Sequence, residues 1–153
     1  HFLRTTLLGS INPVSYISAA HPYVARTLME QALALSEEWP MIVDGITTCS
    51  PGFFAAEGRS VGRIVAPFTI AEFVKDIQGF ETSRGTRIVN HEMESSVLFR
   101  IGHEILGYRV GTICTVLDNL ATDNVLGDHK LLDGRMDRCI EIALHAMVRL
   151  ANQ

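Results

Sequence analysis

The chain has 153 residues, of which 47% are hydrophobic and 20% are charged, so it can bury the core of one domain and is unlike a disordered chain. The formal net charge is -4 and lysines and arginines form no block, which argues against a nucleic-acid-binding surface. No apolar run in the sequence approaches the roughly 18 residues of a membrane span.

Cys49, Cys114 and Cys139 are odd in number, and their spacing matches no metal site. We interpret them as mostly buried thiols of a reducing compartment, and we therefore expect a cytoplasmic protein without a bound metal. The sequence shows no signal peptide, but it begins with His1 instead of methionine. We therefore expect these residues to be a portion of a longer chain.

The first half of the chain alternates strand patterns with helix patterns. Pro22 suits the first turn of a helix of about four turns, whose apolar residues recur on one face. Gly79 is placed to end a second helix. Strands are expected over 14–18 and 40–49, and helices over 21–38 and 69–78.

Two further strand patterns end in acids. A short β-branched run delivers Glu92 and Glu94 to the start of a helix at Ser95, and a longer run over 107–119 ends at Asp118. With a helix between them, the two strands form a right-handed crossover, so their carboxyl ends open on one edge of a parallel sheet. That edge is the predicted rim of an active site.

Three other segments complete the pattern. Residues 53–59 combine two aromatics, an acid and a base without a core period, which is typical of a functional loop. Residues 120–134 fit no element, and a helix is expected over 135–152. Alternation along the strand points His91 away from the Glu92 side chain, and we leave His91 outside the predicted site.

Three motifs occur in order, each at the exit of a predicted strand: Phe-Phe-x-x-x-Gly-Arg at 53–59, Glu-Met-Glu-Ser-Ser-Val at 92–97 and Thr-Val-Leu-Asp at 115–118. Together they resemble the nucleoside phosphorylase family, closest to its uridine phosphorylase branch. The resemblance implies an α/β fold with a central mixed, partly barrel-like sheet flanked by helices as three α/β/α layers. By that likeness, residues 1–153 are the C-terminal portion of a single domain.

The resemblance also implies roles for individual residues. Met93 would pack against the ribose, and Glu94 would accept hydrogen bonds from its 2′ and 3′ hydroxyls, since an ionised carboxylate offers only acceptors. Glu92 would be a second, more structural acid near the same sugar. Phe53 matches an aromatic that lies against the base, and Arg59 matches the arginine aimed at a pyrimidine carbonyl, where it would neutralise charge on the leaving base.

Two positions depart from the uridine phosphorylase pattern. Glu57 stands where those enzymes have a glutamine, and an ionised carboxylate cannot donate to the uracil edge as the amide does. Either Glu57 swings away, or it is protonated, or the preferred base differs. Asn119 replaces an arginine. Asp118 matches an acid that donates a proton to the purine in purine-specific relatives, but uridine phosphorylases carry an aspartate there too.

The expected reaction is reversible phosphorolysis of a pyrimidine nucleoside, in which uridine and phosphate give uracil and ribose 1-phosphate. Asp118 and Arg59 are the expected catalytic residues. The alternatives are a purine nucleoside phosphorylase, a nucleosidase and a non-catalytic nucleoside-binding relative.

Phosphate is the expected co-substrate, and no other cofactor is implied. The family's phosphate-binding residues lie in the N-terminal half, so we expect them in a missing part of the chain or in a companion polypeptide. Active sites at dimer interfaces imply a homodimer or a higher homo-oligomer, with no nucleic-acid or membrane partner. Some relatives also hold a cation at that interface.

Overall fold

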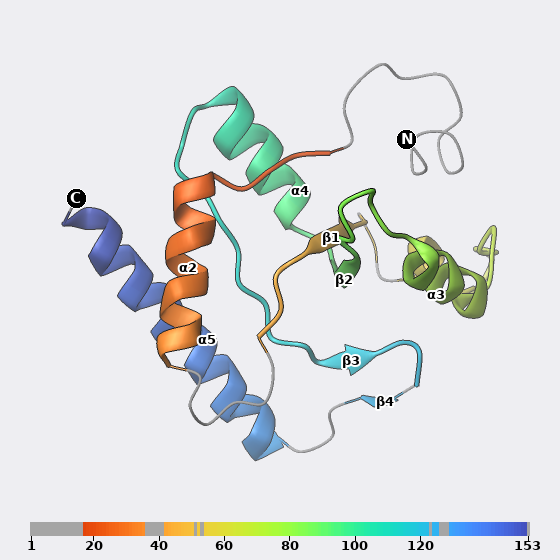
Figure 1. Cartoon of the computed structure of the whole chain (residues 1–153). Coiled ribbons are helices and arrows are strands. Elements are labelled where there is room, and N and C mark those ends of the chain that lie inside the picture. Colours follow the sequence, from red (N-terminus) through yellow and green to blue (C-terminus); the bar gives the residue numbers. More distant parts are fainter. Residues whose placement is uncertain are drawn as a thin grey trace.

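The computed structural model describes residues 17–35, 42–50, 52, 54–122, 124–125 and 129–152. It is a mixed α/β arrangement in which two pairs of strands lie among the helices (Figure 1). The elements are α2 (Pro22–Ala34), β1 (Ile46–Cys49), the 3₁₀ helix η3 (Ala55–Glu57), α3 (Ile70–Gly79), β2 (Ile88–Glu92), α4 (Ser95–Val97), the π-helix η4 (Leu98–Ile105), β3 (Asp118–Asn119), β4 (Asn124–Val125) and α5 (His129–Ala151).

The strands β1 and β2 form a parallel pair, and both of them were expected from the sequence. Ile46 pairs with Ile88 and Cys49 pairs with Glu92, so the carboxyl ends of the two strands lie level. The connection between them contains η3 and α3. Of the strand predicted over 40–49, residues 46–49 form β1, residues 42–45 lie in no strand, and residues 40–41 are outside the described residues.

The strand expected over 107–119 is wrong for most of its length. Residues 107–117 form no strand, and β3 covers Asp118–Asn119 alone, pairing antiparallel with β4. A β-branched sequence favours an extended backbone, but a strand also needs a partner in hydrogen-bond register. The backbone of Val110 accepts a hydrogen bond from His21 N–H at 2.8 Å instead of joining β2.

Other expectations fall partly outside the described residues. Residues 14–16 of the first expected strand are not described, and Ile17 and Ser18 lie in no strand. The segment 120–134, which the sequence left unassigned, contains β4 and the beginning of α5. The helix expected over 135–152 is confirmed, but it starts earlier, at His129.

The small apolar core lies between α2 and α5, which contact each other and cross at an angle in Figure 1. It contains Val24 and Ala32 from α2 and Ile142 and Ala146 from α5. The two helices are also joined at the surface by an ion pair between Arg149 and Glu30 at 2.7 Å. The helix expected over 21–38 is confirmed as α2, which ends at Ala34; residues 36–38 lie outside the described residues.

The helix predicted over 69–78 is confirmed as α3, which begins at a capping box. Thr69 accepts a hydrogen bond from the backbone N–H of Glu72, and the Glu72 carboxylate accepts from the backbone N–H of Thr69. The helix expected after Ser95 is present as α4 and then continues as η4. In η4 the backbone N–H of Leu106 bonds to the carbonyl of Ile101 at 2.9 Å, the five-residue spacing of a π-helix.

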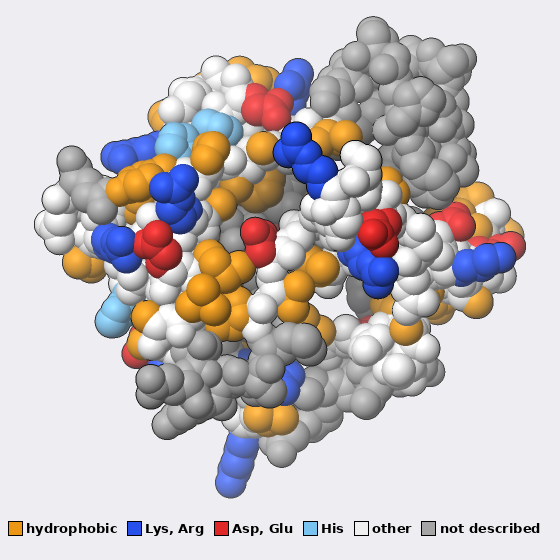
Figure 2. Space-filling view, in the orientation of Figure 1, with side chains coloured by type: hydrophobic (Ala, Val, Ile, Leu, Met, Phe, Trp, Pro, Cys, Tyr) orange, Lys and Arg blue, Asp and Glu red, His pale blue; other side chains and the backbone are white. Residues whose placement is uncertain are grey.

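Large apolar side chains are also exposed on the described surface. Along α4 and η4, Val97 is 59% exposed and Ile105 is 63% exposed. Figure 2 shows hydrophobic side chains gathered near the centre of one face of the molecule. In the part of the chain that the structure describes, no helix has the length and apolarity needed to cross a membrane.

Candidate active site

Glu92 ends β2 and turns its carboxylate back over the start of α4. Its Oε2 accepts hydrogen bonds from the backbone N–H groups of Glu94 and Ser95, both at 2.8 Å, and its Oε1 accepts from the Ser95 hydroxyl at 2.5 Å. Burial raises the pKa of Glu92, but these hydrogen bonds, with a further one from Cys49, outweigh burial and lower it below its usual value. Glu92 therefore organises the strand-to-helix junction.

Met93 and Glu94 face outward at the same junction. Met93 is 42% exposed, and Glu94 is exposed and makes no side-chain capping bond to α4. The junction thus presents an apolar surface next to a carboxylate. Such a pair suits the apolar face and the hydroxyl groups of a sugar.

The loop around η3 forms the second part of the site. Gly58 has a φ of +86°, which turns the chain so that Arg59 N–H bonds to the carbonyl of Phe54 at 2.9 Å. The Arg59 guanidinium then meets the Glu57 carboxylate in a hydrogen-bonded ion pair. Glu57 is only 4% exposed, so its charge is compensated by Arg59 in a buried setting.

His91 of β2 is the second partner of Glu57. Its Nε2 lies 3.3 Å from Glu57 Oε1 and 3.1 Å from Ser50 Oγ, and its Nδ1 lies 2.8 Å from Thr48 Oγ1. The Ser50 hydroxyl donates to the carbonyl of Gly52 at 3.1 Å, so it accepts from His91. Because the Glu57 carboxylate can only accept, a neutral His91 that bonds to it carries its hydrogen on Nε2, and its Nδ1 then accepts from the Thr48 hydroxyl, which also lies 3.4 Å from the carbonyl oxygen of Asn90.

The surroundings of His91 favour its neutral form. Burial lowers the pKa of His91, the charges of Glu57 and Glu92 raise it, and Arg59 lowers it, with a net decrease. The ring also packs edge-on against Phe73 of α3, with centroids 5.0 Å apart. His91 is therefore held in place by β1, α3 and the η3 loop together.

Asp118 reaches the same loop from β3. Its Oδ2 lies 3.8 Å from Arg59 Nη2, whereas its Oδ1 is buried without a hydrogen-bond partner among the described residues. A buried carboxylate oxygen without a partner is costly, and a ligand that donates a hydrogen bond would relieve that cost. The long strand expected to carry Asp118 beside the exit of β2 is absent: Asp118 belongs to β3, which pairs with β4 and not with β2, and it reaches Arg59 of the loop from there.

The predicted site residues fall into two groups. Arg59 contacts the Glu57 carboxylate and lies near Asp118, and His91, which was not predicted, contacts the same Glu57 carboxylate. We call these four residues the Glu57 cluster. Glu92, Met93 and Glu94 lie together at the exit of β2, while Phe53 lies outside the described residues.

The sequence pattern leaves His91 outside the predicted site, because alternation along β2 indicates only that His91 points away from the Glu92 side chain. Thr48 and Ser50, both polar and alternating at the end of β1, are the signal that could have found it. In a parallel pair with β2, they lie beside His91, and the register does pair Thr48 with His91.

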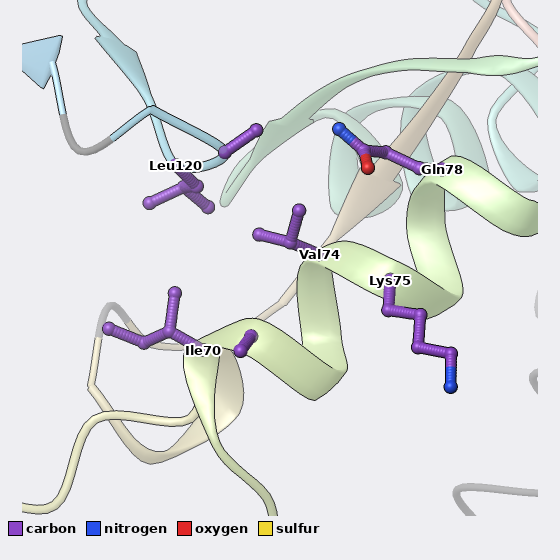
Figure 3. Close-up of a pocket in the computed structure, with 7 residues that line it drawn as sticks. Ile70, Val74, Lys75, Gln78 and Leu120 are labelled. Atoms are coloured by element: carbon purple, nitrogen blue, oxygen red, sulfur yellow. The ribbon is translucent and has the colours of Figure 1, made fainter.

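Two cavities in the described part of the molecule are lined by none of the predicted site residues. One, of about 460 Å³, lies between α3 and the chain after β3. Ile70, Val74 and Leu120 face one another across it, while Lys75 points away (Figure 3). The other, of about 570 Å³, lies at the start of β1 and β2 near Arg84.

Within the described ranges, no group of three or more His, Cys, Asp or Glu side chains is placed to hold a metal ion. No model of a protein family matches the chain, and no curated protein sequence matches it. A solved structure does: the crystal structure of a Trypanosoma brucei nucleoside phosphorylase, described as showing uridine phosphorylase activity.

That match has a TM-score of 0.73 and 28% sequence identity, and it covers 86% of this chain. It covers 43% of the trypanosomal chain, so the present chain corresponds to less than half of that protein. The structure thus defines a mixed α/β chain similar to a nucleoside phosphorylase. The resemblance that the three sequence motifs indicated is confirmed.

Proposed function

We propose that the protein is a nucleoside phosphorylase and that its preferred nucleoside is uridine, which it converts with phosphate to uracil and ribose 1-phosphate. The observation that carries the proposal is the match to a nucleoside phosphorylase over 86% of this chain. The positions of the site residues support it. Acids and a guanidinium lie at the level carboxyl ends of a parallel strand pair, where α/β folds bind ligands.

The exit of β2 would bind the ribose. The exposed Glu94 carboxylate would accept hydrogen bonds from the two vicinal hydroxyls, and Met93 would cover the apolar face of the ring. Glu92 would fix both residues through its bonds to the backbone of Glu94 and Ser95. A ribose held in this way presents its anomeric carbon in one orientation.

Arg59 and Asp118 of the Glu57 cluster, together with Phe53, would bind the base. Phe53 would lie against the flat face of the base, and Glu57 would contribute to the wall of the same pocket. Arg59 would stabilise the charge that gathers on the base as phosphate attacks the anomeric carbon and the glycosidic bond breaks. Asp118, close to Arg59, would complete the catalytic pair.

The rest of the enzyme would come from outside this chain. The described residues contain no glycine-rich phosphate loop, so phosphate would be held by another portion of the protein or by a companion polypeptide. That portion would also extend β1 and β2 into the mixed, partly barrel-like sheet of a single domain. We further propose a cytoplasmic homodimer or higher oligomer, with each site at an interface.

A purine nucleoside phosphorylase is the second candidate, and the buried Oδ1 of Asp118, which has no hydrogen-bond partner among the described residues, favours it. Asp118 would then face the purine ring as the acid that assists departure of the base. A nucleosidase, which uses water, and a non-catalytic nucleoside-binding protein are further alternatives with no observation that favours them.

The test is base release from uridine, inosine and adenosine by the complete protein, each with and without phosphate. Uracil release that depends on phosphate supports the proposal. Hypoxanthine or adenine release would assign a purine enzyme, and release without phosphate would assign a nucleosidase. A folded protein that binds uridine and releases no base would identify a binding protein.

A further inference from the structure

Glu57 lies between two donors that use both of its carboxylate oxygens. Arg59 donates to Oε2, and His91 Nε2 lies 3.3 Å from Oε1. The side chain of Glu57 is 5% exposed and that of His91 is 11% exposed. Glu57 is therefore committed to protein partners, and a base that entered the pocket would have to displace one of them to reach its carboxylate.

A series of contacts connects the strand pair β1–β2 to the η3 loop. Thr48 of β1 donates to His91 Nδ1, and His91 Nε2 donates to Glu57. Glu57 in turn accepts from Arg59, whose other terminal nitrogen lies 3.8 Å from Asp118. Because each link is a directed hydrogen bond or ion pair, the position of the strand pair determines the position of the guanidinium.

We propose that His91 and Glu57 are positioning residues that hold the Arg59 guanidinium beside Asp118, so that the base is recognised by Arg59 and Asp118 and not by Glu57. The inference rests on the proposed function, because it assigns the base side of that site. It also accounts for the departure at Glu57: a glutamate that serves as a fixed partner of an arginine has no need of the amide N–H that a base ligand would use.

The proposal includes the kind of base that fits. A guanidinium donates to a carbonyl oxygen, and the buried Oδ1 of Asp118, which has no hydrogen-bond partner among the described residues, can accept from an N–H group. A base edge with a carbonyl next to an N–H satisfies both residues, as in uracil and in 6-oxopurines. Bases with an amino group next to an unprotonated ring nitrogen, as in cytosine and adenine, present the opposite pattern.

The experiment compares His91→Asn with His91→Gln in the complete protein. The amide of asparagine lies near the position of Nδ1 and keeps the contact with Thr48 but does not reach Glu57. The longer glutamine carries its N–H to the position of Nε2, where it can donate to Glu57. Both variants are first checked for an unchanged melting temperature to within a few degrees.

We expect His91→Asn to raise the KM for the nucleoside by about tenfold to a hundredfold, in line with the effect of misplacing a binding group, while the KM for phosphate stays constant. His91→Gln should restore the nucleoside KM to near the wild-type value. In an Arg59→Ala background, where nothing remains to be positioned, His91→Asn should have little further effect.

Three results would overturn the inference. Equal KM values for the two variants would show that the donor to Glu57 is unimportant, and full additivity with Arg59→Ala would show that His91 acts independently of Arg59. Faster turnover of cytidine or adenosine than of uridine and inosine would exclude the proposed recognition of a base edge that has a carbonyl next to an N–H. A wild-type protein that releases no base would instead remove the proposed function itself, and the inference with it.

Discussion

Gly58 lies against Thr69 so closely that a Cβ at Gly58 would come within 2.4 Å of the Thr69 carbonyl carbon. The same glycine has a φ of +86°, a conformation that L side chains rarely adopt. The turn between Glu57 and Arg59 is therefore fixed both by its own backbone and by the beginning of α3. This contact between the loop and the start of α3 therefore helps to fix the base side of the site.

Gly58→Ala should disrupt the η3 loop. Gly62→Ala is the matched control, because Gly62 has a φ of +59° and no atom within 4 Å of an added Cβ. Positive φ alone should cost about 1–2 kcal/mol of unfolding free energy in both variants, and the clash with Thr69 should add to that cost in Gly58→Ala only. Chemical denaturation measures the difference. Equal losses in the two variants would contradict the packing at Thr69.

Glu92 and Glu94 should separate stability from ribose binding. Glu92→Ala removes the acceptor of two backbone N–H groups and should lower the unfolding free energy by about 0.5–2 kcal/mol, as loss of a helix cap does. Glu94→Ala removes an exposed carboxylate, so stability should change by no more than about 0.5 kcal/mol. Calorimetry with uridine should show binding lost in Glu94→Ala. The reverse pattern would disprove both roles: Glu94→Ala would lower the unfolding free energy, and Glu92→Ala would leave it unchanged but abolish uridine binding.

His91 should make the protein less stable in mild acid. Its pKa is lowered in the folded state, so the unfolded chain binds the proton more readily. The contribution of His91 to stability is therefore present above its unfolded pKa and is lost as the pH falls through that value toward the lower folded pKa. Between about pH 7 and pH 5, the melting temperature of the wild type should fall more steeply than that of His91→Gln. Parallel curves for the two proteins would show that the imidazole is not the group responsible.

Asp118→Asn should reduce base release far more than it reduces stability. If Asp118 assists the departure of the base, its loss should lower the rate about 10²–10⁴-fold, the usual contribution of a general acid or base. Stability should be maintained, because an amide oxygen can still face Arg59. Single-turnover base release measures the chemical step, and Asp76→Asn, an exposed carboxylate on α3, is the control. An Asp118→Asn enzyme with the wild-type rate would remove Asp118 from the reaction.

The sequence predicted the local elements well, because their signals are local. Proline in the first turn of α2, the amphipathic pattern of α5 and the apolar positions of α3 all indicate helices without knowledge of the rest of the molecule. The exit of β2 at Glu92 follows from the change between strand and helix periodicity. Among them, the bounds of α3 differ by only one residue at each end between prediction and structure, whereas α5 begins six residues earlier than predicted.

The errors concern partners that no local pattern contains. The segment 107–117 is rich in β-branched residues, yet it forms no strand, because strand pairing depends on which segment lies beside it in space. The π-helical hydrogen bonds of η4 leave no distinct apolar period in the sequence. His91 was missed for a related reason: its partners Thr48 and Glu57 lie on other elements, and only the register of β1 with β2 brings them together.

The parallel pairing of β1 and β2 also has a consequence for the order of folding. The hydrogen bond between Thr48 and His91 joins residues 43 apart in sequence, and that between Ser50 and His91 joins residues 41 apart. Closing such a loop costs conformational entropy before any of its contacts compensates, whereas the Glu57–Arg59 pair forms within one turn. We therefore expect the loop that carries Glu57 and Arg59 to form early through local contacts, and its link to His91 to form later, when β1 pairs with β2. During synthesis, that pairing requires the chain to have been extended beyond His91.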